Sequence, residues 1–287
     1  MNEDPCGLWL DEPTDRYQRL VHQGARWHGR YWVAGELLRI AVDPDDGVPV
    51  CDELGLRQAT VAAVAAEMLL AGQIGCDDQT APDGRRVPAA ITWTGTPVRD
   101  PAGLILTHAV EQAAGPRSVR HWMTHLYDEV FAAVADRFVA TGMMRWETRA
   151  DRRGRRRPVL VATYPNGGAS RNAMYRLQRA VEATVRADTG RKIRTRPRPR
   201  PRSPAEQWWQ AVEQPAEPGL TVEDAACGSL LVALGLSDYI RTESGARTKT
   251  RLARALPPRV GQMASPPLRS LLAHAAAAIR QTATRVR

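Results

Sequence analysis

The sequence predicts a mainly α-helical fold: a single globular helical domain with a protruding β-hairpin and a disordered Arg/Pro-rich insertion. Three observations carry this prediction. Apolar residues recur at helical spacing in several long segments, one strand–basic turn–strand pattern occurs near the middle of the chain, and Arg alternates with Pro over residues 194–204. At 287 residues, 43% of them hydrophobic, the chain is long enough to bury a proper core.

The helices are predicted from apolar spacing and from end signals. The alanine-rich segment 56–75, closed by Gly72, is the clearest helix. Residues 32–42 fit a short helix or a strand, because periodicity alone does not decide between them. Residues 118–142 have helical spacing throughout, and we expect a break near Tyr127 because one helix of that length would be unusually long. Further helices are expected from Asp100-Pro101, over 171–187, from Val222, near 244–255 and over roughly 266–283.

Strands are expected in two places. The segment from Arg85-Arg86 to Thr92 fits a strand with a charged start. The block MMRWETRADRRGRRRPVLVATYP, residues 143–165, predicts a hairpin with its tip at Asp151–Arg157. The acidic pairs Asp45-Asp46 and Asp77-Asp78 have the character of turn residues.

The chain divides by composition into an arm, a helical domain and a linker. Residues 1–30 form a polar N-terminal arm, while 31–187 and 219–287 together form the helical domain. Residues 188–218 separate them as a flexible linker, because alternating Arg and Pro favour an extended, solvated conformation. Trp208 and Trp209 are the only apolar anchor expected in that linker.

Positive charge is concentrated in three segments of the chain. Residues 149–157, 186–202 and 241–287 carry net charges of +5, +7 and +9, so that the remainder carries −12 against a total of +9. Such asymmetry implies surface patches that attract polyanions, either phosphate head groups or nucleic acid.

The hairpin tip is the first candidate binding site. Its arginines lie beside the apolar residues Val159–Val161, an arrangement that could touch lipid head groups; the alternative is a solvated turn without a partner. The candidate residues are Arg152, Arg153, Arg155, Arg156 and Arg157.

Catalytic and metal-binding patterns are missing from the sequence. It has no GxSxG elbow, no complete phosphate-binding loop and no CxxC pair. His121 and His125 have the i, i+4 spacing of two metal ligands, but the catalytic Glu of HExxH is missing and a structural role is favoured. We therefore expect no enzyme activity, no cofactor and no metal.

The localisation expected is cytoplasmic, with a peripheral position on the inner face of the membrane. No apolar run reaches the roughly 18–20 residues that span a bilayer, and the acidic N-terminus lacks the apolar core of a secretory signal.

Several segments resemble, in order, the Golgi phosphoprotein 3 family, especially bacterial members of the actinobacterial type. No single motif is specific, but the ordered set covers most of the chain outside the arm and the linker. The matching segments are AGELLRIAVDPDDG (34–47), AAVAAEMLLAGQI (62–74), TPVRD (96–100), VRHWMTHL (119–126), DRFVATGMMRWE (136–147) and LLVALGLSDYI (230–240).

The resemblance implies an all-α core whose β-hairpin can mediate self-association, here over residues 145–164. Eukaryotic members recognise phosphatidylinositol 4-phosphate through one tryptophan and three arginines. The aligned positions here hold other residues, namely Asp52, Val61, Asp128 and Phe131. Arg57, one helical turn before Val61, is a candidate replacement for a lost arginine.

Three functions follow, in order of preference. The first is a non-enzymatic, peripheral membrane adaptor that binds anionic phospholipid of the phosphatidylinositol 4-phosphate type. The second is a protein-interaction or regulatory module that does not bind lipid. Nucleic-acid binding ranks third, because basic segments supply phosphate affinity but no base readout.

Overall fold

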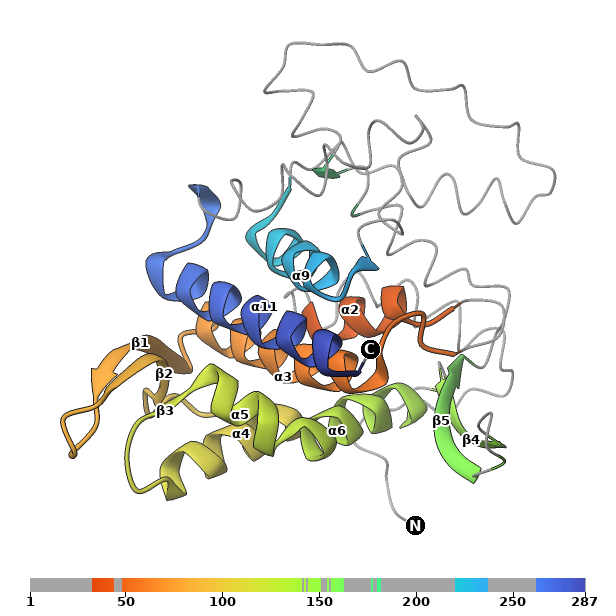
Figure 1. Cartoon of the computed structure of the whole chain (residues 1–287), viewed down its shortest axis with the longest axis horizontal. Coiled ribbons are helices and arrows are strands. Elements are labelled where there is room, and N and C mark those ends of the chain that lie inside the picture. Colours follow the sequence, from red (N-terminus) through yellow and green to blue (C-terminus); the bar gives the residue numbers. More distant parts are fainter. Residues whose placement is uncertain are drawn as a thin grey trace, which may run out of the picture.

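Helix α3 (Glu53–Leu70) is the centre of the fold, and α2, α6, α9 and α11 pack around it (Figure 1). The computed structural model describes residues 33–43, 48–140, 142, 144–150, 154, 156–162, 177, 180–181, 220–236 and 262–286. The predicted mainly α class is confirmed. In chain order the elements are α2 (Val33–Ala41), α3, β1 (Ile74–Thr80), β2 (Arg86–Trp93), α4 (Pro101–Gln112), β3 (Arg117–Ser118), α5 (Val119–His125), α6 (Tyr127–Ala140), β4 (Met144–Ala150), β5 (Arg156–Ala162), α9 (Val222–Ala233) and α11 (Pro266–Val286).

Helix α3 is buried around most of its circumference because its sequence is rich in small apolar residues. Asp52 caps its start by accepting a hydrogen bond from the Gly55 N–H at 2.7 Å. The helix stops before Gly72, whose φ of 68° suits a residue without a side chain. A helix that is apolar on every side belongs in a core, and alanine lets its neighbours approach closely. Five alanines are fully buried: Ala59, Ala62, Ala63, Ala65 and Ala66.

The strand β1 was missed by the sequence prediction, which placed Asp77 and Asp78 in a turn and extended the preceding helix to residue 75. Both aspartates lie in β1, which pairs with β2 in an antiparallel sheet. The register shifts beside Asp78, where its Oδ1 accepts a hydrogen bond from the Ala89 N–H at 3.0 Å and Ala89 takes a φ of 47°. The side chain thus replaces a ladder hydrogen bond at a bulge, which makes a polar pair compatible with a strand.

Two predicted boundaries are confirmed between β2 and α6. Asp100 caps α4 by accepting from the Gly103 N–H at 3.1 Å, and Pro101 occupies the first helical turn. The break expected near Tyr127 lies at Leu126, between α5 and α6. The strand predicted to end at Thr92 is also confirmed as β2, with Trp93 as its last residue.

The buried face of α6 holds both phenylalanines of the chain. Phe131 and Phe138 are seven residues apart and therefore lie on the same side of the helix. The Arg57 guanidinium carbon lies 5.1 Å from the centre of the Phe131 ring, and that of Arg39 lies 5.5 Å from the centre of the Phe138 ring. Each ring thus covers apolar surface and carries a cation above it.

A buried carboxyl group links α3 to the start of α2, which the sequence left open between helix and strand and which is a helix. Glu67 Oε1 accepts a hydrogen bond from the Ala34 N–H at 2.7 Å. Burial is the main reason that the pKa of Glu67 is raised to about 8; Asp100 acts in the same direction, while the backbone hydrogen bonds and Arg137 oppose the shift. Arg137 itself donates to Asp100 at 2.8 Å. Four helices therefore meet at this polar group.

Helices α9 and α11 close the core on the side of α3 opposite α4. Figure 1 shows α11 crossing α3, and Thr282 of α11 donates to Gln58 Oε1 at 2.9 Å. The helices predicted from Val222 and over 266–283 are confirmed. Several other predictions lie outside the described residues: the arm 1–30, Asp45-Asp46, the linker 188–218 with Trp208 and Trp209, the helix near 244–255, and all of 171–187 except Leu177, Ala180 and Val181.

The start of α9 is fixed by a reciprocal cap. The Thr221 hydroxyl accepts from the Asp224 N–H at 3.1 Å, and Asp224 Oδ2 accepts from the Thr221 N–H at 3.2 Å. Replacing Thr221 by alanine is expected to lower the free energy of unfolding by about 1 kcal/mol, measured by urea denaturation. Thr221→Ser, which keeps the hydroxyl, is the control. Equal stability of both variants would show that the cap does not stabilise the helix.

Candidate functional site

The β4–β5 hairpin projects from the helical core and is anchored by Trp146 (Figure 1). The indole N–H of Trp146 donates to Asp136 Oδ1 at 3.3 Å, and its ring meets Phe131 edge-on with 6.5 Å between centres. Leu160, opposite Trp146 in the ladder, is buried. The predicted hairpin is confirmed, and α6 fixes the side on which it projects.

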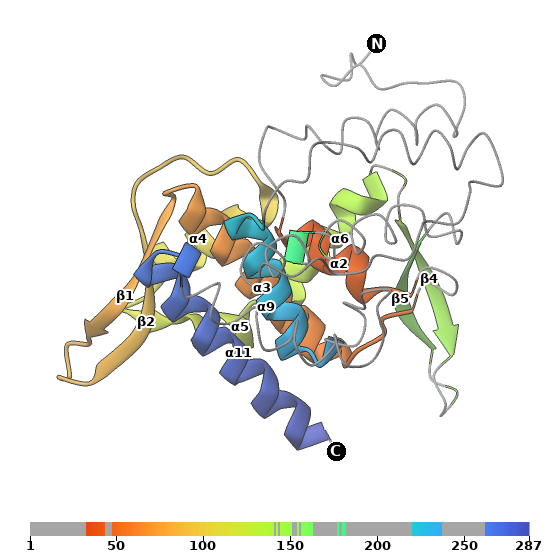
Figure 2. The same ribbon diagram turned by 90° about the horizontal axis from the view of Figure 1, so that it is seen from above.

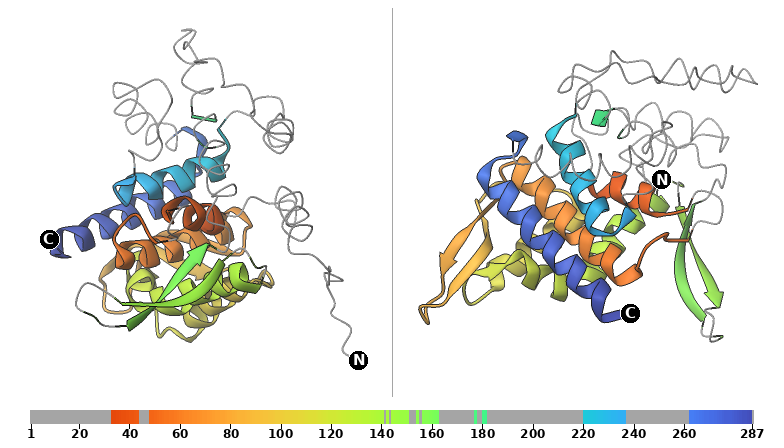
Figure 3. Two further views of the ribbon diagram at one scale, coloured as in Figure 1. Left: turned by 90° about the vertical axis from the view of Figure 1, so that its right-hand side faces the viewer. Right: turned by 45° about the horizontal axis from the view of Figure 1, so that its top comes forward.

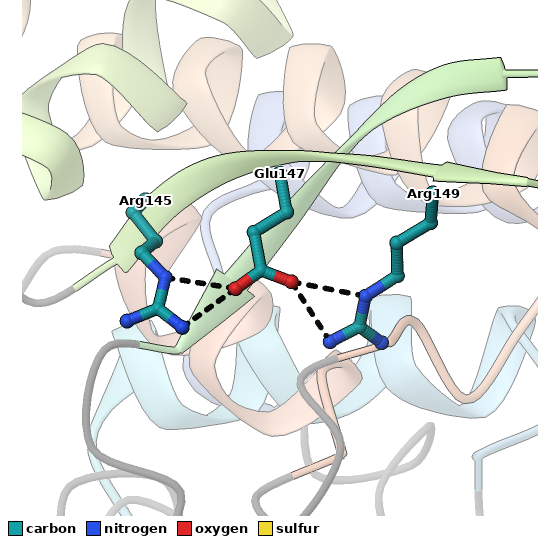
Figure 4. Close-up of polar contacts among 3 residues, drawn as sticks. All are labelled: Arg145, Glu147 and Arg149. Carbon is teal, nitrogen blue, oxygen red and sulfur yellow. Dashed lines mark hydrogen bonds and ion pairs between the residues drawn. The ribbon is translucent and has the colours of Figure 1, made fainter.

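On the face of β4 opposite Trp146, three charged side chains form a row. Arg145, Glu147 and Arg149 alternate with Trp146 and Thr148, so they share one side of the strand. Figure 4 shows the two arginines reaching toward Glu147 from either side. Arg145 Nε and Nη2 lie 2.8 and 2.6 Å from Glu147 Oε1, and Arg149 Nε and Nη2 each lie 3.1 Å from Oε2.

This row carries a net charge of +1 and has both guanidinium groups held in place. Hydrogen bonds from Arg145 and then Arg149 lower the pKa of Glu147, so it is ionised at neutral pH. Glu147 contacts only the Nε and Nη2 atoms, and the Nη1 end of each guanidinium is left for another anion. The Arg145 side chain is 57% exposed. The row can therefore contact phosphate groups from solvent.

The tip residues of the sequence prediction are described only in part. Arg156 is exposed at the start of β5, opposite Ala150. Arg157 lies opposite Arg149 in the ladder. Arg152, Arg153 and Arg155 lie outside the described residues.

Arg145, Glu147 and Arg149 were not singled out from the sequence. The alternation of R-W-E-T-R already places the three charges on one side of a strand and Trp146 on the other. The denser run of arginines at the tip is the stronger signal of positive charge in the sequence.

The match to a known family covers most of the chain. The sequence pattern of the family described as Golgi phosphoprotein 3 (GPP34) matches residues 33–275. The chain belongs to the Golgi phosphoprotein 3 family. This is not a known enzyme family. A search of curated proteins finds no match.

The four positions that the sequence analysis assigned by resemblance to the head-group site lie on α3 and α6 or next to α3. Asp52 caps α3, and Val61 is completely buried. Asp128 and Phe131 both contact Arg57, the first by an ion pair and the second by its ring. The candidate replacement Arg57 is thus brought close to two of the four positions.

Arg57 is already bound by two carboxylates. Its Nη2 donates to Glu53 Oε1 at 2.6 Å, and its Nη1 donates to Asp128. Burial by itself would lower the pKa of Arg57, but the hydrogen bonds to Glu53 and Asp128 raise it above its ordinary value. A phosphate would have to displace these acids, whose combined charge exceeds that of Arg57. The hairpin row is therefore the more accessible cationic surface.

His121 and His125 stack on each other, with 4.0 Å between ring centres. The Nδ1–H of His125 donates to the His121 carbonyl oxygen at 2.8 Å. Within the described ranges no group of three His, Cys, Asp or Glu residues is arranged to hold a metal ion. The two rings lie on the surface of α5, where His121 is half-buried and His125 is exposed.

None of the helices in the described part of the chain has both the length and the hydropathy needed to cross a bilayer.

Proposed function

We propose that this member of the Golgi phosphoprotein 3 family is a non-enzymatic, peripheral membrane adaptor that binds anionic phospholipid surfaces through the β4–β5 hairpin. The observation that carries the proposal is the Arg145–Glu147–Arg149 row, which is followed in the sequence by the hairpin tip, residues 151–157, with five arginines among seven residues. Cations near an anionic membrane contribute about 1 kcal/mol each. A lipid of the phosphatidylinositol 4-phosphate type carries a phosphate monoester besides its phosphodiester, so its head group offers more negative charge than that of phosphatidylserine.

The hairpin differs from the Arg57 region in what it offers a phosphate. Each guanidinium of the row keeps an end that Glu147 does not contact, whereas Arg57 donates from both of its terminal nitrogens to acids. Arg57 would join the contact only after releasing Glu53 and Asp128. Binding by an exposed patch rather than by a pocket follows from this difference.

The test is flotation of the full chain with vesicles of neutral phosphatidylcholine, with and without phosphatidylserine or phosphatidylinositol 4-phosphate. We expect salt-sensitive binding to the anionic vesicles only. Replacing the five arginines of the hairpin tip should weaken binding about 10³-fold or more, because five cations are removed. The substitutions are Arg152→Gln, Arg153→Gln, Arg155→Gln, Arg156→Gln and Arg157→Gln.

A control with the same change in charge separates the hairpin from diffuse attraction. Five linker arginines replaced by glutamine remove the same charge elsewhere in the chain, and they should weaken binding much less. Equal losses in both variants, or no preference of the wild type for anionic vesicles, would refute binding through the hairpin. The control positions are Arg194, Arg196, Arg198, Arg200 and Arg202.

A protein-interaction module is the second candidate, and the loop 94–99 favours it. Trp93, 40% exposed, donates from its indole N–H to the Thr96 carbonyl oxygen at 3.2 Å. Gln73 Nε2 donates to the Pro97 carbonyl oxygen at 3.1 Å, so the loop is held firmly although it is exposed. In the flotation test, a protein of this kind should bind none of the vesicles, so it should stay at the bottom of the density gradient whatever their composition.

A further inference from the structure

Glu147 is the single acidic residue in the two strands of the β4–β5 hairpin. These strands also hold four arginines, so their net charge is +3. Figure 2 shows the hairpin at the end of the fold opposite β1 and β2, and in the left-hand view of Figure 3 it lies in front of the helices. One acid on such a surface lowers its attraction for anions, so charge alone does not explain Glu147.

Glu147 is the least exposed residue of the row. Its side chain is 28% exposed, whereas the side chains of Arg149 and Arg145 are 37% and 57% exposed. Each arginine contacts its own oxygen of the carboxylate, Arg145 contacting Oε1 and Arg149 contacting Oε2. Within the described part of the chain, neither arginine has a second acidic partner. The two cations are therefore more accessible from solvent than the acid that holds them.

Both arginines use the same edge of the guanidinium to contact Glu147. Each binds through Nε and Nη2, which leaves both hydrogens of Nη1 and one hydrogen of Nη2 for another acceptor. One hydrogen of Nη1 and one of Nη2 point the same way and form an end fork, which fits two oxygens of one phosphate group. Figure 4 shows the end forks of Arg145 and Arg149 facing in the same direction.

We propose that Glu147 is a positioning residue, which holds the end forks of Arg145 and Arg149 in one orientation so that both donate to phosphate groups of an anionic lipid surface. The proposal rests on the proposed function and assigns the orientation of its binding site. Ordering each long side chain before binding strengthens binding about fivefold, because that entropy is not lost on contact. Two such gains exceed the roughly fivefold loss caused by one negative charge near the membrane.

The variant Glu147→Ala tests the proposal, because orientation and charge predict opposite results. Attraction by charge alone predicts roughly fivefold tighter binding to phosphatidylcholine vesicles that contain phosphatidylserine, since one negative charge is removed. Loss of orientation at two arginines outweighs that gain, so we expect about fivefold weaker binding. Glu111→Ala removes the same charge from an exposed position on α4, away from the hairpin, and should not weaken binding.

A second variant of the full chain keeps the charge and removes the forks. Arg145→Lys combined with Arg149→Lys leaves the net charge unchanged, but an ammonium group has no planar fork for two phosphate oxygens. Binding to the same vesicles should weaken roughly tenfold. Arg120→Lys, at an exposed position on α5, makes the same exchange away from the hairpin and should bind like the wild type.

Four results would overturn the positioning role. If the wild type binds through the hairpin tip but Glu147→Ala binds more tightly, Glu147 does not position the arginines and the proposed function stands. If the wild type binds no anionic vesicles, both proposals fail. A lower urea midpoint for Glu147→Ala, together with weaker binding, would assign Glu147 to the stability of the hairpin. If a single-stranded oligonucleotide or inorganic phosphate displaces the vesicles at equal ionic strength, the phosphate groups recognised are not those of a lipid surface.

Discussion

Replacing Phe138 by alanine is expected to lower the free energy of unfolding by about 3–5 kcal/mol. Phe138 is fully buried on the inner face of α6, and removing its ring leaves a cavity that the surrounding helices fill only partly. The Arg39 guanidinium also loses the ring that it lies over. Urea denaturation followed by circular dichroism measures the change.

Two variants serve as controls for the Phe138 prediction. Phe138→Leu keeps most of the volume and should cost less than about 1.5 kcal/mol. Leu104→Ala removes an apolar side chain that is 47% exposed on α4, and should change stability by no more than about 0.5 kcal/mol. A cost for Phe138→Ala as small as that of Leu104→Ala would mean that α6 does not pack as described.

The second large effect is a loss of stability as the pH rises, caused by Glu67. Burial raises its pKa from an ordinary value of 4.5 to about 8. Between these values the folded chain holds a proton that the unfolded chain has released. The stabilising contribution is complete below about pH 4.5 and is lost as the pH passes through 8, with a slope of up to about 1.4 kcal/mol per pH unit.

The variant Glu67→Gln isolates this contribution. Glutamine keeps an oxygen that can accept from the Ala34 N–H but has no proton to release. Urea denaturation of both proteins between pH 5 and pH 9 should give a smaller decline with pH for the variant. Parallel curves for the two proteins would show that Glu67 does not titrate in this range.

Local signals predicted several boundaries, among them the start of α4. Asp100-Pro101 marks the start of α4 because a side-chain cap and a proline at the first turn act within a few residues. The hairpin β4–β5 was also predictable, since its alternating residues and charged turn are contiguous. These features need no knowledge of the rest of the chain.

The features that were missed depend on contacts between distant residues. Strand β1 has a polar sequence and exists because β2 pairs with it, with Asp78 bonded to the Ala89 N–H across the bulge. The partners of Arg57 include Asp128, 71 positions later. Glu67 gives no sign in the sequence that it meets the start of α2, 33 positions earlier. Periodicity and composition carry no information on such pairs.

The order of the helices along the chain has a consequence for biosynthesis. Helix α3 leaves the ribosome early, but α11, which covers it, is translated about 200 residues later. At a translation rate of about 5–20 residues per second, α11 is completed roughly 10–40 s after α3, and the apolar side of α3 is not covered by α11 during that time. A nascent chain stalled before residue 266 would expose that surface, and such fragments should be bound by chaperones or degraded.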